Sequence, residues 1–342
     1  MKSIVEYVWI DAKNTCRSKS KVIENLLIID DKIEFPEWNF DGSSTGQSEG
    51  QNSEIILKPC CAFTHSLLKN IPTSYSSYLV LCDCYFPDGQ PISSNTRYLA
   101  KQIFDSVKNE EPWFGIEQEY VLIDNNMNNF LGWPQTGLPE KQGKYYCGNG
   151  CDRSFGRTLV EEHYMMCLSA GIKICGINQE VMPSQWEFQI GICEGIEAAD
   201  HLMMARFLLI RCAEKYNIKV SFEPKPIDGD WNGSGCHTNF STRRMRTEIV
   251  GFNEITIAIE KLSKSHSEHL KVYGDNSKRL SGTHETSSFD KFTSGVGDRS
   301  ASIRIPSMTL KNMSGYIEDR RPASDCDPYL VTAIMAKTVL LD

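Results

Sequence analysis

The sequence has no long apolar run and no excess of positive charge, and both absences narrow the range of possible functions. Acidic residues outnumber basic ones by 44 to 36, which gives a formal net charge of −8. Such a protein is repelled by the phosphates of nucleic acids and by anionic membrane surfaces. The most apolar stretch, FLLI at 207–210, is far shorter than the roughly 20 residues of a membrane-spanning helix. We therefore expect no nucleic-acid partner and no membrane partner.

The usual signatures of zinc knuckles and disulfide frameworks are also missing. The thirteen cysteines include no CxxC pair, and several of them lie within apolar segments. This spacing is typical of reduced cysteines that pack as small hydrophobic residues. The stretch MKSIVEYVWID at 1–11 reaches acidic residues too early for the apolar core of a secretion signal. We therefore expect a cytoplasmic protein.

Neither of the familiar nucleotide-binding loops, GxxxxGK[ST] or GxGxxG, occurs in the sequence, which disfavours P-loop and Rossmann folds. GSSTG at 42–46 does match the GxSxG pattern of serine hydrolases. That motif needs an apolar strand before it and a helix after it, whereas NFD and QSEGQNSE flank it here. We therefore disfavour a hydrolase. Asp41, directly before the match, is an acid on a polar loop that is well placed to reach a neighbouring site.

Turn-forming residues divide the chain into a small strand-rich part and a larger mixed part. Strand-like segments lie at 4–10, 54–57 and 78–86, and a Pro/Gly cluster, FPDGQP, follows them. We place a domain boundary near residue 90, which gives domains of 1–90 and 91–342. In the second domain, helical patterns such as 197–216 and 252–272 alternate with strands, and a long loop is expected at 125–156. The pattern predicts an α+β fold.

A pair of carboxylates lies within the apolar strand pattern WFGIEQEYVLI at 113–123. Side chains along a strand alternate between its two faces, so Glu117 and Glu119 share one face. Like charges on a half-buried strand repel each other and lose hydration, so this arrangement requires a cation. The alternative, for an isolated pair, is a strand whose polar face meets solvent.

Similar side chains recur on other strand-like segments. Glu180 and Glu187 flank a proline-containing segment, His237 lies in GSGCHTNFS, and Glu318 lies in YIEDRR. Together with the first pair they suggest one acidic cavity, and oxygen-rich sites of this kind select Mg²⁺ or Mn²⁺. Two such ions close together would need a polyanion to bridge them, which points to a nucleoside triphosphate.

Arginines are concentrated in the last quarter of the chain. Five fall within 43 residues: Arg279, Arg299, Arg304, Arg320 and Arg321. A surface salt bridge is an adequate explanation for any single one. As a set, on segments that also carry Glu285 and Glu318, they suit the binding of a transferring phosphoryl group.

Six segments together resemble glutamine synthetases of the eukaryotic type. They are EWNFDGSST at 37–45, PWFGIEQEY at 112–120, EVMPSQWEFQIG at 180–191, NGSGCHTNFS at 232–241, DRSASIRIP at 298–306 and YIEDRRP at 316–322. They follow one another in the family's order over nearly the whole chain. The resemblance implies an α+β fold with a small β-grasp-like N-terminal domain. It implies a catalytic domain whose curved, barrel-like antiparallel sheet is flanked by helices.

The resemblance also implies an activity and an assembly. The activity is ATP-dependent ligation of ammonium to the γ-carboxylate of L-glutamate through γ-glutamyl phosphate, which yields glutamine, ADP and phosphate. The assembly is a homodecamer of stacked rings, with each active site between two subunits. ATP is then a co-substrate, and two or more Mg²⁺ or Mn²⁺ ions are the cofactors.

Residue roles follow from the same resemblance, position by position. The first metal site would consist of Glu117, His237 and Glu318, next to the γ-phosphate of ATP. The second, near the substrate glutamate, would consist of Glu119, Glu180 and Glu187. Glutamate would be bound by Asn232, Gly233 and, at its α-carboxylate, Arg279. The phosphates of ATP and of the intermediate would be bound by Arg299, Arg304 and Arg320.

The remaining implied roles concern adenine, ammonium and closure of the site. Trp113 and Ser241 would line the adenine pocket. Glu285, in GTHETS, would be a flap residue that closes the site, and Asp41 of the adjacent subunit would take a proton from ammonium. Either Tyr145 or Tyr146 would complete the ammonium site, and the sequence leaves both open.

Two other functions remain compatible with the resemblance. The first is a non-enzymatic relative that kept the fold and lost the site, but every acidic ligand and arginine named above is present. The second is a ligase that joins an amine other than ammonia to glutamate. Asp41 and the tyrosines favour ammonium.

Overall fold

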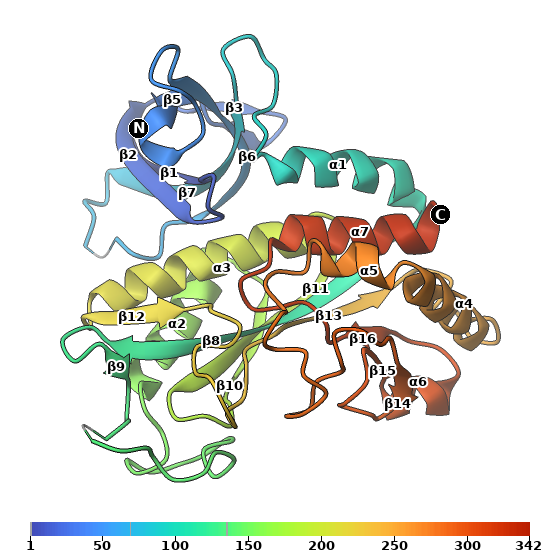
Figure 1. The fold of residues 1–342 in the computed structure, drawn as a ribbon. Coiled ribbons are helices and arrows are strands. Elements are labelled where there is room, and N and C mark those ends of the chain that lie inside the picture. The colour runs from blue at the N-terminus through green and yellow to red at the C-terminus, as the bar shows by residue number, and fades with distance from the viewer. Residues whose placement is uncertain (1, 69, 135) are drawn as a thin grey trace. The chain divides into compact units, whose positions relative to one another are not determined.

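Two sheets, one of five strands and one of nine, organise the chain (Figure 1). The computed structural model describes residues 2–68, 70–134 and 136–342. The sheets belong to two units, the first made of 1–101 with 166–172 and the second of 102–165 with 173–342. Residues 1 and 69 of the first predicted domain, and residue 135 of the predicted long loop, lie outside the described residues.

The sheet of the first unit has the order β2-β1-β7-β6-β5, in which the neighbouring strands β1 and β7 run parallel. Its strands are β1 (Lys2–Ile10), β2 (Cys16–Glu24), β5 (Trp38–Asp41), β6 (Glu54–Thr64) and β7 (Tyr75–Tyr85). The core contains Val5, Tyr7, Leu57 and Val80. The three strands expected from the sequence are confirmed. The sequence analysis missed β2, β5 and the short hairpin of β3 (Leu27–Ile29) and β4 (Lys32–Glu34), whose residues are largely exposed or polar.

The sheet of the second unit follows the path β10-β11-β8-β13-β16-β15-β14, and β9 and β12 both pair with β8. Its strands are β8 (Trp113–Asp124), β9 (Asn129–Phe130), β10 (Ile174–Gln179), β11 (Gln185–Glu194), β12 (Ile218–Ser221), β13 (Cys236–Ser241), β14 (Ser294–Val296), β15 (Ile303–Ile305) and β16 (Ile317–Asp319). Neighbouring strands are antiparallel except β14 and β15. The curled sheet and its helices confirm the predicted α+β class.

The helices are α1 (Thr96–Val107), α2 (Arg157–Ala170), α3 (Glu197–Glu214), α4 (Gly251–Lys264), α5 (His266–Leu270), α6 (Ser307–Asn312) and α7 (Pro328–Leu340), with short 3-10 turns η1 (Gly42–Thr45) and η2 (Lys108–Glu110). The helix expected at 197–216 is confirmed as α3. The single helix expected at 252–272 is instead two, α4 and α5, because the backbone leaves helical geometry at Ser265. Helix α7 begins where the Asp327 side chain accepts a hydrogen bond from the backbone N–H of Tyr329.

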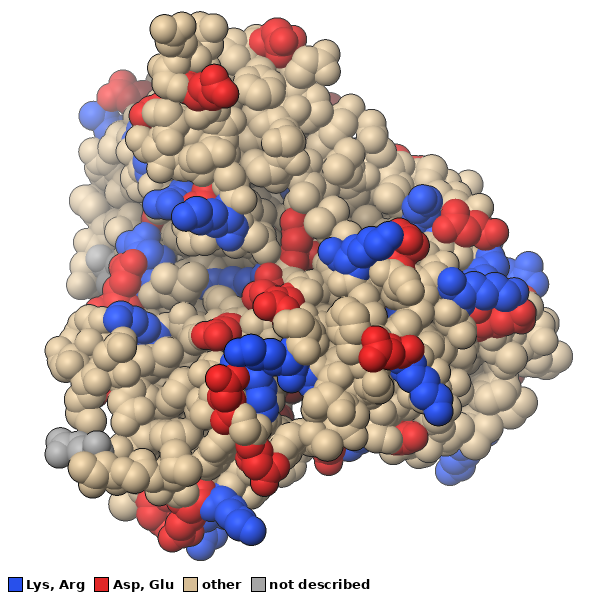
Figure 2. Space-filling view, in the orientation of Figure 1, with Lys and Arg blue, Asp and Glu red and all other residues tan. Residues whose placement is uncertain are grey.

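The distribution of surface charge, the length of the helices and the state of the cysteines can be compared with the expectations from sequence. On the face drawn in Figure 2, acidic and basic side chains are interspersed rather than gathered into one field of a single sign. Within the three described ranges, no helix is both long and apolar enough to cross a membrane. In the same ranges the cysteines carry thiols rather than disulfides.

A buried arginine fixes which face of β8 meets helix α3. Arg206 of α3 donates from Nε to Oε1 of Gln118 (2.8 Å), and its other nitrogens donate to the carbonyl oxygens of Cys326 (2.9 Å) and Ser324 (3.0 Å). Gln118 is fully buried by these contacts. Since side chains alternate along a strand, Glu117 and Glu119 are turned to the opposite face of the sheet.

We expect Arg206→Met to lower the free energy of unfolding by about 3 kcal/mol, because each buried acceptor left unpaired costs about 1–3 kcal/mol. Thermal unfolding monitored by differential scanning fluorimetry measures the effect as a lower Tm. Arg211→Met on the same helix is the control, because Arg211 is partly exposed and pairs with Glu214 at the surface. Equal Tm values for the two variants would contradict this role of Arg206.

Candidate active site

Strand register brings the carboxylates of β8 next to those of β11. Glu119 lies directly opposite Glu187, and Glu117 lies opposite Gln189. Directly opposed residues on neighbouring antiparallel strands have Cβ atoms about 4.5–5.5 Å apart, so their side chains share one surface. Two acidic side chains in this position repel each other unless protons or cations intervene.

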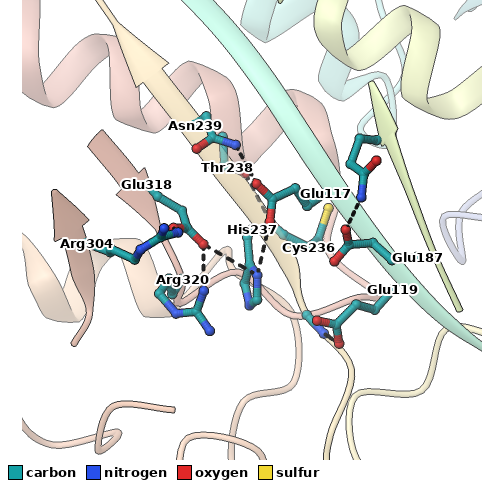
Figure 3. Close-up of polar contacts among 12 residues, drawn as sticks. Glu117, Glu119, Glu187, Cys236, His237, Thr238, Asn239, Arg304, Glu318 and Arg320 are labelled. Atoms are coloured by element: carbon teal, nitrogen blue, oxygen red, sulfur yellow. Dashed lines mark hydrogen bonds and ion pairs between the residues drawn. The ribbon is translucent and has the colours of Figure 1, made fainter. Parts of the chain in front are cut away.

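The same face carries His237 and Glu318 on the next strands. His237 of β13 is paired with Glu117, and Glu318 of β16 is paired with Asn239. His237 Nδ1 lies 3.7 Å from Oε2 of Glu117 and 3.7 Å from Oε1 of Glu318 (Figure 3). One donor atom from each of these three residues can be chosen so that all lie within 4.8 Å of one another. This triad offers a cation two carboxylate oxygens and an imidazole nitrogen.

A polar cavity of about 590 Å³ opens over these strands. It is lined by every residue that the family resemblance assigned to metal, glutamate or phosphate, and also by Tyr146 and Glu285: Glu117, Glu119, Tyr146, Glu180, Glu187, Asn232, Gly233, His237, Arg279, Glu285, Arg299, Arg304, Glu318 and Arg320. These residues come from strands and loops spread over two hundred positions of sequence, and the fold of the second unit brings them together.

Burial and mutual repulsion favour protons on the carboxylates of this cavity. Burial first, and then the nearby charge of Glu119, raises the pKa of Glu180 to about 8. Burial and the neighbouring glutamates raise the pKa of Glu187 to about 9. Burial also raises the pKa of Glu119, although the guanidinium of Arg279 opposes it. A bound cation would replace these protons, and burial keeps the pKa of His237 well below its ordinary value, so the imidazole is neutral and able to coordinate.

Two arginines already neutralise one of the carboxylates. Glu318 forms ion pairs with Arg304 and, at 2.6 Å, with Arg320 (Figure 3). Arg320 also donates to the backbone carbonyl oxygens of Arg299 (2.9 Å) and Glu285 (3.3 Å). Among the described residues, Nε of Arg304 is buried without a hydrogen-bond acceptor. That orphaned donor, at the edge of a cavity, is suited to an anionic oxygen.

The expected arginine cluster needs one correction. Arg321 does not belong to it, because Asp319 and Arg321 project from β16 to the side opposite Glu318 and Arg320. There Arg321 donates to both carboxylate oxygens of Asp319, at 2.9 and 2.7 Å, and both side chains are fully buried. The alternation of a strand therefore divides the EDRR run into two site residues and two core residues.

Arg279 lines the cavity but is held mainly by the protein. It donates to the carbonyl oxygens of Arg320 and Arg321, both at 3.1 Å, and one of its nitrogens lies 3.2 Å from Nε2 of His237. Gly235 permits this packing, since a Cβ there would lie 2.4 Å from the Arg279 guanidinium and 2.7 Å from the imidazole. The backbone N–H of Gly235 also donates to Glu119 (2.8 Å). The GSG motif is thus explained by close approach.

A second, mainly apolar cavity of about 390 Å³ adjoins the first, with which it shares Glu117 and Gln189. Trp113 and Ser241 line it, together with Phe114, Phe240 and Tyr316. Its polar wall includes Asn239 and Arg246. The guanidinium carbon of Arg246 lies 3.6 Å from the Trp113 ring centroid, and Arg246 donates to Oγ of Ser241 (3.0 Å). Flat rings beside a cation suit a planar heteroaromatic group.

The remaining predicted residues are Asp41, Tyr145 and Tyr146, which differ in their location and in their exposure to solvent. Asp41 is in the first unit, where it is exposed and accepts hydrogen bonds from the backbone and hydroxyl of Ser43 and from the hydroxyl of Ser44. These bonds lower its pKa to about 2. Tyr145 is buried, with its hydroxyl 3.5 Å from the carbonyl oxygen of Glu140, whereas Tyr146 is half exposed and lines the polar cavity.

Several residues of the two cavities were missed by sequence reasoning. They are Asn178, Gln189, Asn239, Arg246, His284 and Tyr316. Gln189 was detectable, because it shares the strand alternation of Glu187. The others are neutral or single charges in segments without a distinctive pattern, and only the register of the folded sheet and the path of the loops bring them to the site.

The chain is similar to known proteins along almost its whole length. A family profile described as "Glutamine synthetase, catalytic domain" matches residues 93–257. Glutamine synthetase of Candida glabrata is 51% identical over 339 residues, which cover 99% of this chain and 89% of that protein. Glutamine synthetase cytosolic isozyme 1-1 of rice is 49% identical, covering 99% of this chain and 94% of that protein.

The fold has a counterpart among solved structures. A cryo-EM structure of Plasmodium falciparum glutamine synthetase superposes with a TM-score of 0.77 at 19% identity, over 98% of this chain and 71% of that one. At that identity the match establishes the fold alone. The sequence matches are about 50% identical over almost the whole chain, and they establish the family as well. The protein belongs to the glutamine synthetase family, whose members make glutamine from glutamate and ammonia with ATP.

Proposed function

We propose that this chain joins ammonium to the γ-carboxylate of L-glutamate through γ-glutamyl phosphate, with the cleavage of ATP to ADP and phosphate. One observation carries the proposal beyond family membership. An acidic, arginine-rich cavity and an apolar cavity lined by aromatic rings share a wall at Glu117 and Gln189. A nucleoside triphosphate has the matching parts, a flat base followed by a polyanion.

The donors of the polar cavity fit hard divalent cations, Mg²⁺ or Mn²⁺. Carboxylate oxygens are the ligands that such ions prefer, and the neutral imidazole of His237 can add one nitrogen ligand. We assign one ion to Glu117, His237 and Glu318. We assign the other to Glu119, Glu180 and Glu187. Bound there, the ions would supply positive charge that offsets the negative charge of the triphosphate.

The substrate roles follow the geometry of the two cavities. We assign the base of ATP to Trp113 and Ser241 and its phosphates to Arg299, Arg304 and Arg320. We assign glutamate to Asn232 and Gly233, with its α-carboxylate at Arg279. The support for these roles is that each residue lines the cavity expected for it.

In the proposed first step, a γ-carboxylate oxygen of glutamate attacks the γ-phosphorus of ATP, and ADP leaves. The guanidinium groups of Arg299, Arg304 and Arg320 neutralise charge as the phosphoryl group transfers. The acyl phosphate would hydrolyse in water, so the flap segment, residues 283–286 around Glu285, excludes solvent. Ammonia then attacks the acyl carbon, and phosphate leaves.

Ammonium must lose a proton before it can attack. We assign that proton to the carboxylate of Asp41 from a neighbouring subunit and assign Tyr146 to the same ammonium site. This assignment requires a homo-oligomer, for which we propose the stacked-ring decamer, with the chemistry carried by residues 91–342 and Asp41 supplied by the domain of residues 1–90. The cytosolic rice relative supports a cytoplasmic location.

The central test is product formation. Purified protein with ATP, Mg²⁺, glutamate and ammonium should release one phosphate for each glutamine formed, and Glu117→Gln should abolish both because it removes a proposed metal ligand. Glu248→Gln is the control, because Glu248 is an exposed acid of the same unit. Efficient coupling of other amines, with no glutamine from ammonium, would replace the ammonia assignment by an amine ligase.

The raised pKa values predict how pH acts on the metal-free protein. A glutamate with a raised pKa stabilises the fold below its ordinary pKa, and this contribution is lost as pH rises through the folded-state value. For Glu180 and Glu187 the loss extends to about pH 8 and 9. The Tm without divalent cations should therefore fall from pH 6 to 9, and Mn²⁺ should raise it most at the alkaline end.

Glu187→Gln provides the comparison for this prediction, because it removes one of the two raised carboxyl groups. The metal-free variant should lose less Tm between pH 6 and 9 than the wild type, and it should gain less from Mn²⁺. Parallel Tm curves for variant and wild type, with and without Mn²⁺, would contradict the assignment.

The role proposed for Asp41 can be tested with a nucleophile that needs no base. Hydroxylamine is already neutral at pH 7, so Asp41→Asn should slow glutamine synthesis by about 10²-fold or more, the usual contribution of a general base, and slow γ-glutamyl hydroxamate synthesis far less. Asp30→Asn, also exposed in the first unit, is the control. Equal loss of both products would show that Asp41 does not act as the base.

A further inference from the structure

One side chain ties together three loops at the glutamate end of the polar cavity. Oε1 of Gln142 accepts a hydrogen bond from the backbone N–H of Asn232 (2.8 Å). Nε2 of Gln142 lies 3.3 Å from the carbonyl oxygen of Asp230 and 3.2 Å from Nδ1 of His284. Gln142 thus bridges its own loop, the loop of the proposed glutamate residues, and the flap segment.

The contacts of His284 are consistent with one orientation of this amide. Because Oε1 faces a backbone donor, Nε2 must face the imidazole, and it donates to Nδ1. The proton of His284 is then on Nε2, which lies 2.9 Å from Oδ1 of Asp230. Every polar contact in the chain from Asn232 through Gln142 and His284 to Asp230 therefore pairs a donor with an acceptor.

The flap segment needs such support because its backbone is strained. His284 and Glu285 are consecutive non-glycine residues at φ of 54° and 58°. Left-handed conformations of this kind persist only where surrounding contacts hold them. His284 is held by its contacts with Gln142 and Asp230, and Glu285 is held by the bond from Arg320 to its carbonyl oxygen (3.3 Å) and by an ion pair with Arg299 (3.8 Å).

The loop of Gln142 is itself attached to the metal-site side of the cavity. The N–H of Gly143 donates to the carbonyl oxygen of Val181 (2.8 Å), next to Glu180, and the N–H of Cys147 donates to that of Gln179 (3.0 Å). Tyr146, assigned to ammonium, lies between these two attachments. A shift of Gln142 would therefore be felt at the glutamate, ammonium and flap residues together.

We propose that Gln142 is a positioning residue that couples glutamate binding at Asn232 to the conformation of the flap. Gln142 is not one of the described residues that line the polar cavity, so it acts through Asn232 and His284 rather than on the substrate. The inference rests on the proposed function, since it assumes that glutamate binds at Asn232. It assigns the protection of the acyl phosphate to the link from Asn232 through Gln142 to His284, which joins the proposed glutamate loop to the flap segment.

The test is Gln142→Glu, which keeps the acceptor for Asn232 and replaces the amide donor with a carboxylate oxygen. KM for glutamate should rise about tenfold or more, as for a small displacement of positioning groups. Phosphate released per glutamine formed should rise above one, because the flap admits water. KM for ATP and the Tm should stay near the wild-type values, since the apolar cavity and the core are unchanged.

Lys141→Gln is the control variant, because Lys141 precedes Gln142 on the same loop and its side chain is exposed. The double variant of Gln142→Ala with His284→Ala should leak no more phosphate than the worse single variant, because both remove the same link.

Two results would overturn the proposal. One is wild-type KM for glutamate and tight coupling in Gln142→Glu. The other is a parallel loss of Tm and of ATP and glutamate binding, which indicates a structural role only. A wild-type protein that makes no glutamine would instead refute the proposed function.

Discussion

Repulsion among buried carboxylates is the constraint on which the site depends. Register places Glu119 opposite Glu187, and the fold adds Glu180 to the same cavity. Burial and mutual repulsion raise the pKa values of all three. Without a bound cation, these carboxyl groups are therefore either protonated or ionised at an electrostatic cost. The bond between Arg206 and Gln118 fixes helix α3 against the opposite face of the sheet, so these side chains cannot turn to that face instead. In the proposed function, a divalent cation would resolve this conflict and a triphosphate would complete the charge balance.

Glu318 shows how the same charge is balanced by the protein's own groups. It is paired with Arg304 and Arg320, the arginines proposed to bind phosphate. An acidic site paired throughout in this way would need no metal. Among the described residues, however, arginines form ion pairs with one of the six proposed metal ligands, Glu318. Burial raises the pKa values of Glu119, Glu180 and Glu187, and the charge of Arg279 only partly opposes this effect at Glu119.

Much of the site could be predicted from sequence, because strand alternation is a local property. It places Glu117 with Glu119, and the resemblance of six segments supplies the rest of the metal set. Arg321 was misassigned although the same alternation separates it from Arg320, and it pairs with Asp319 in the core. The other omissions depend on contacts between segments far apart in the sequence or on strands with little apolar surface. Strands β2 to β4 were missed because they bury little apolar surface, and Gln142 because its role exists only between three folded loops.

The most direct measurement of the central claim is a structure of the oligomer with Mn²⁺ and a non-hydrolysable ATP analogue, in which anomalous scattering locates the metal. The account predicts two manganese peaks in each active site, one among Glu117, His237 and Glu318 and the other among Glu119, Glu180 and Glu187, with the phosphates between them and the arginines. Manganese that is absent from both sites, with Glu318 still paired to Arg304 and Arg320 and the phosphates bound elsewhere, would contradict it.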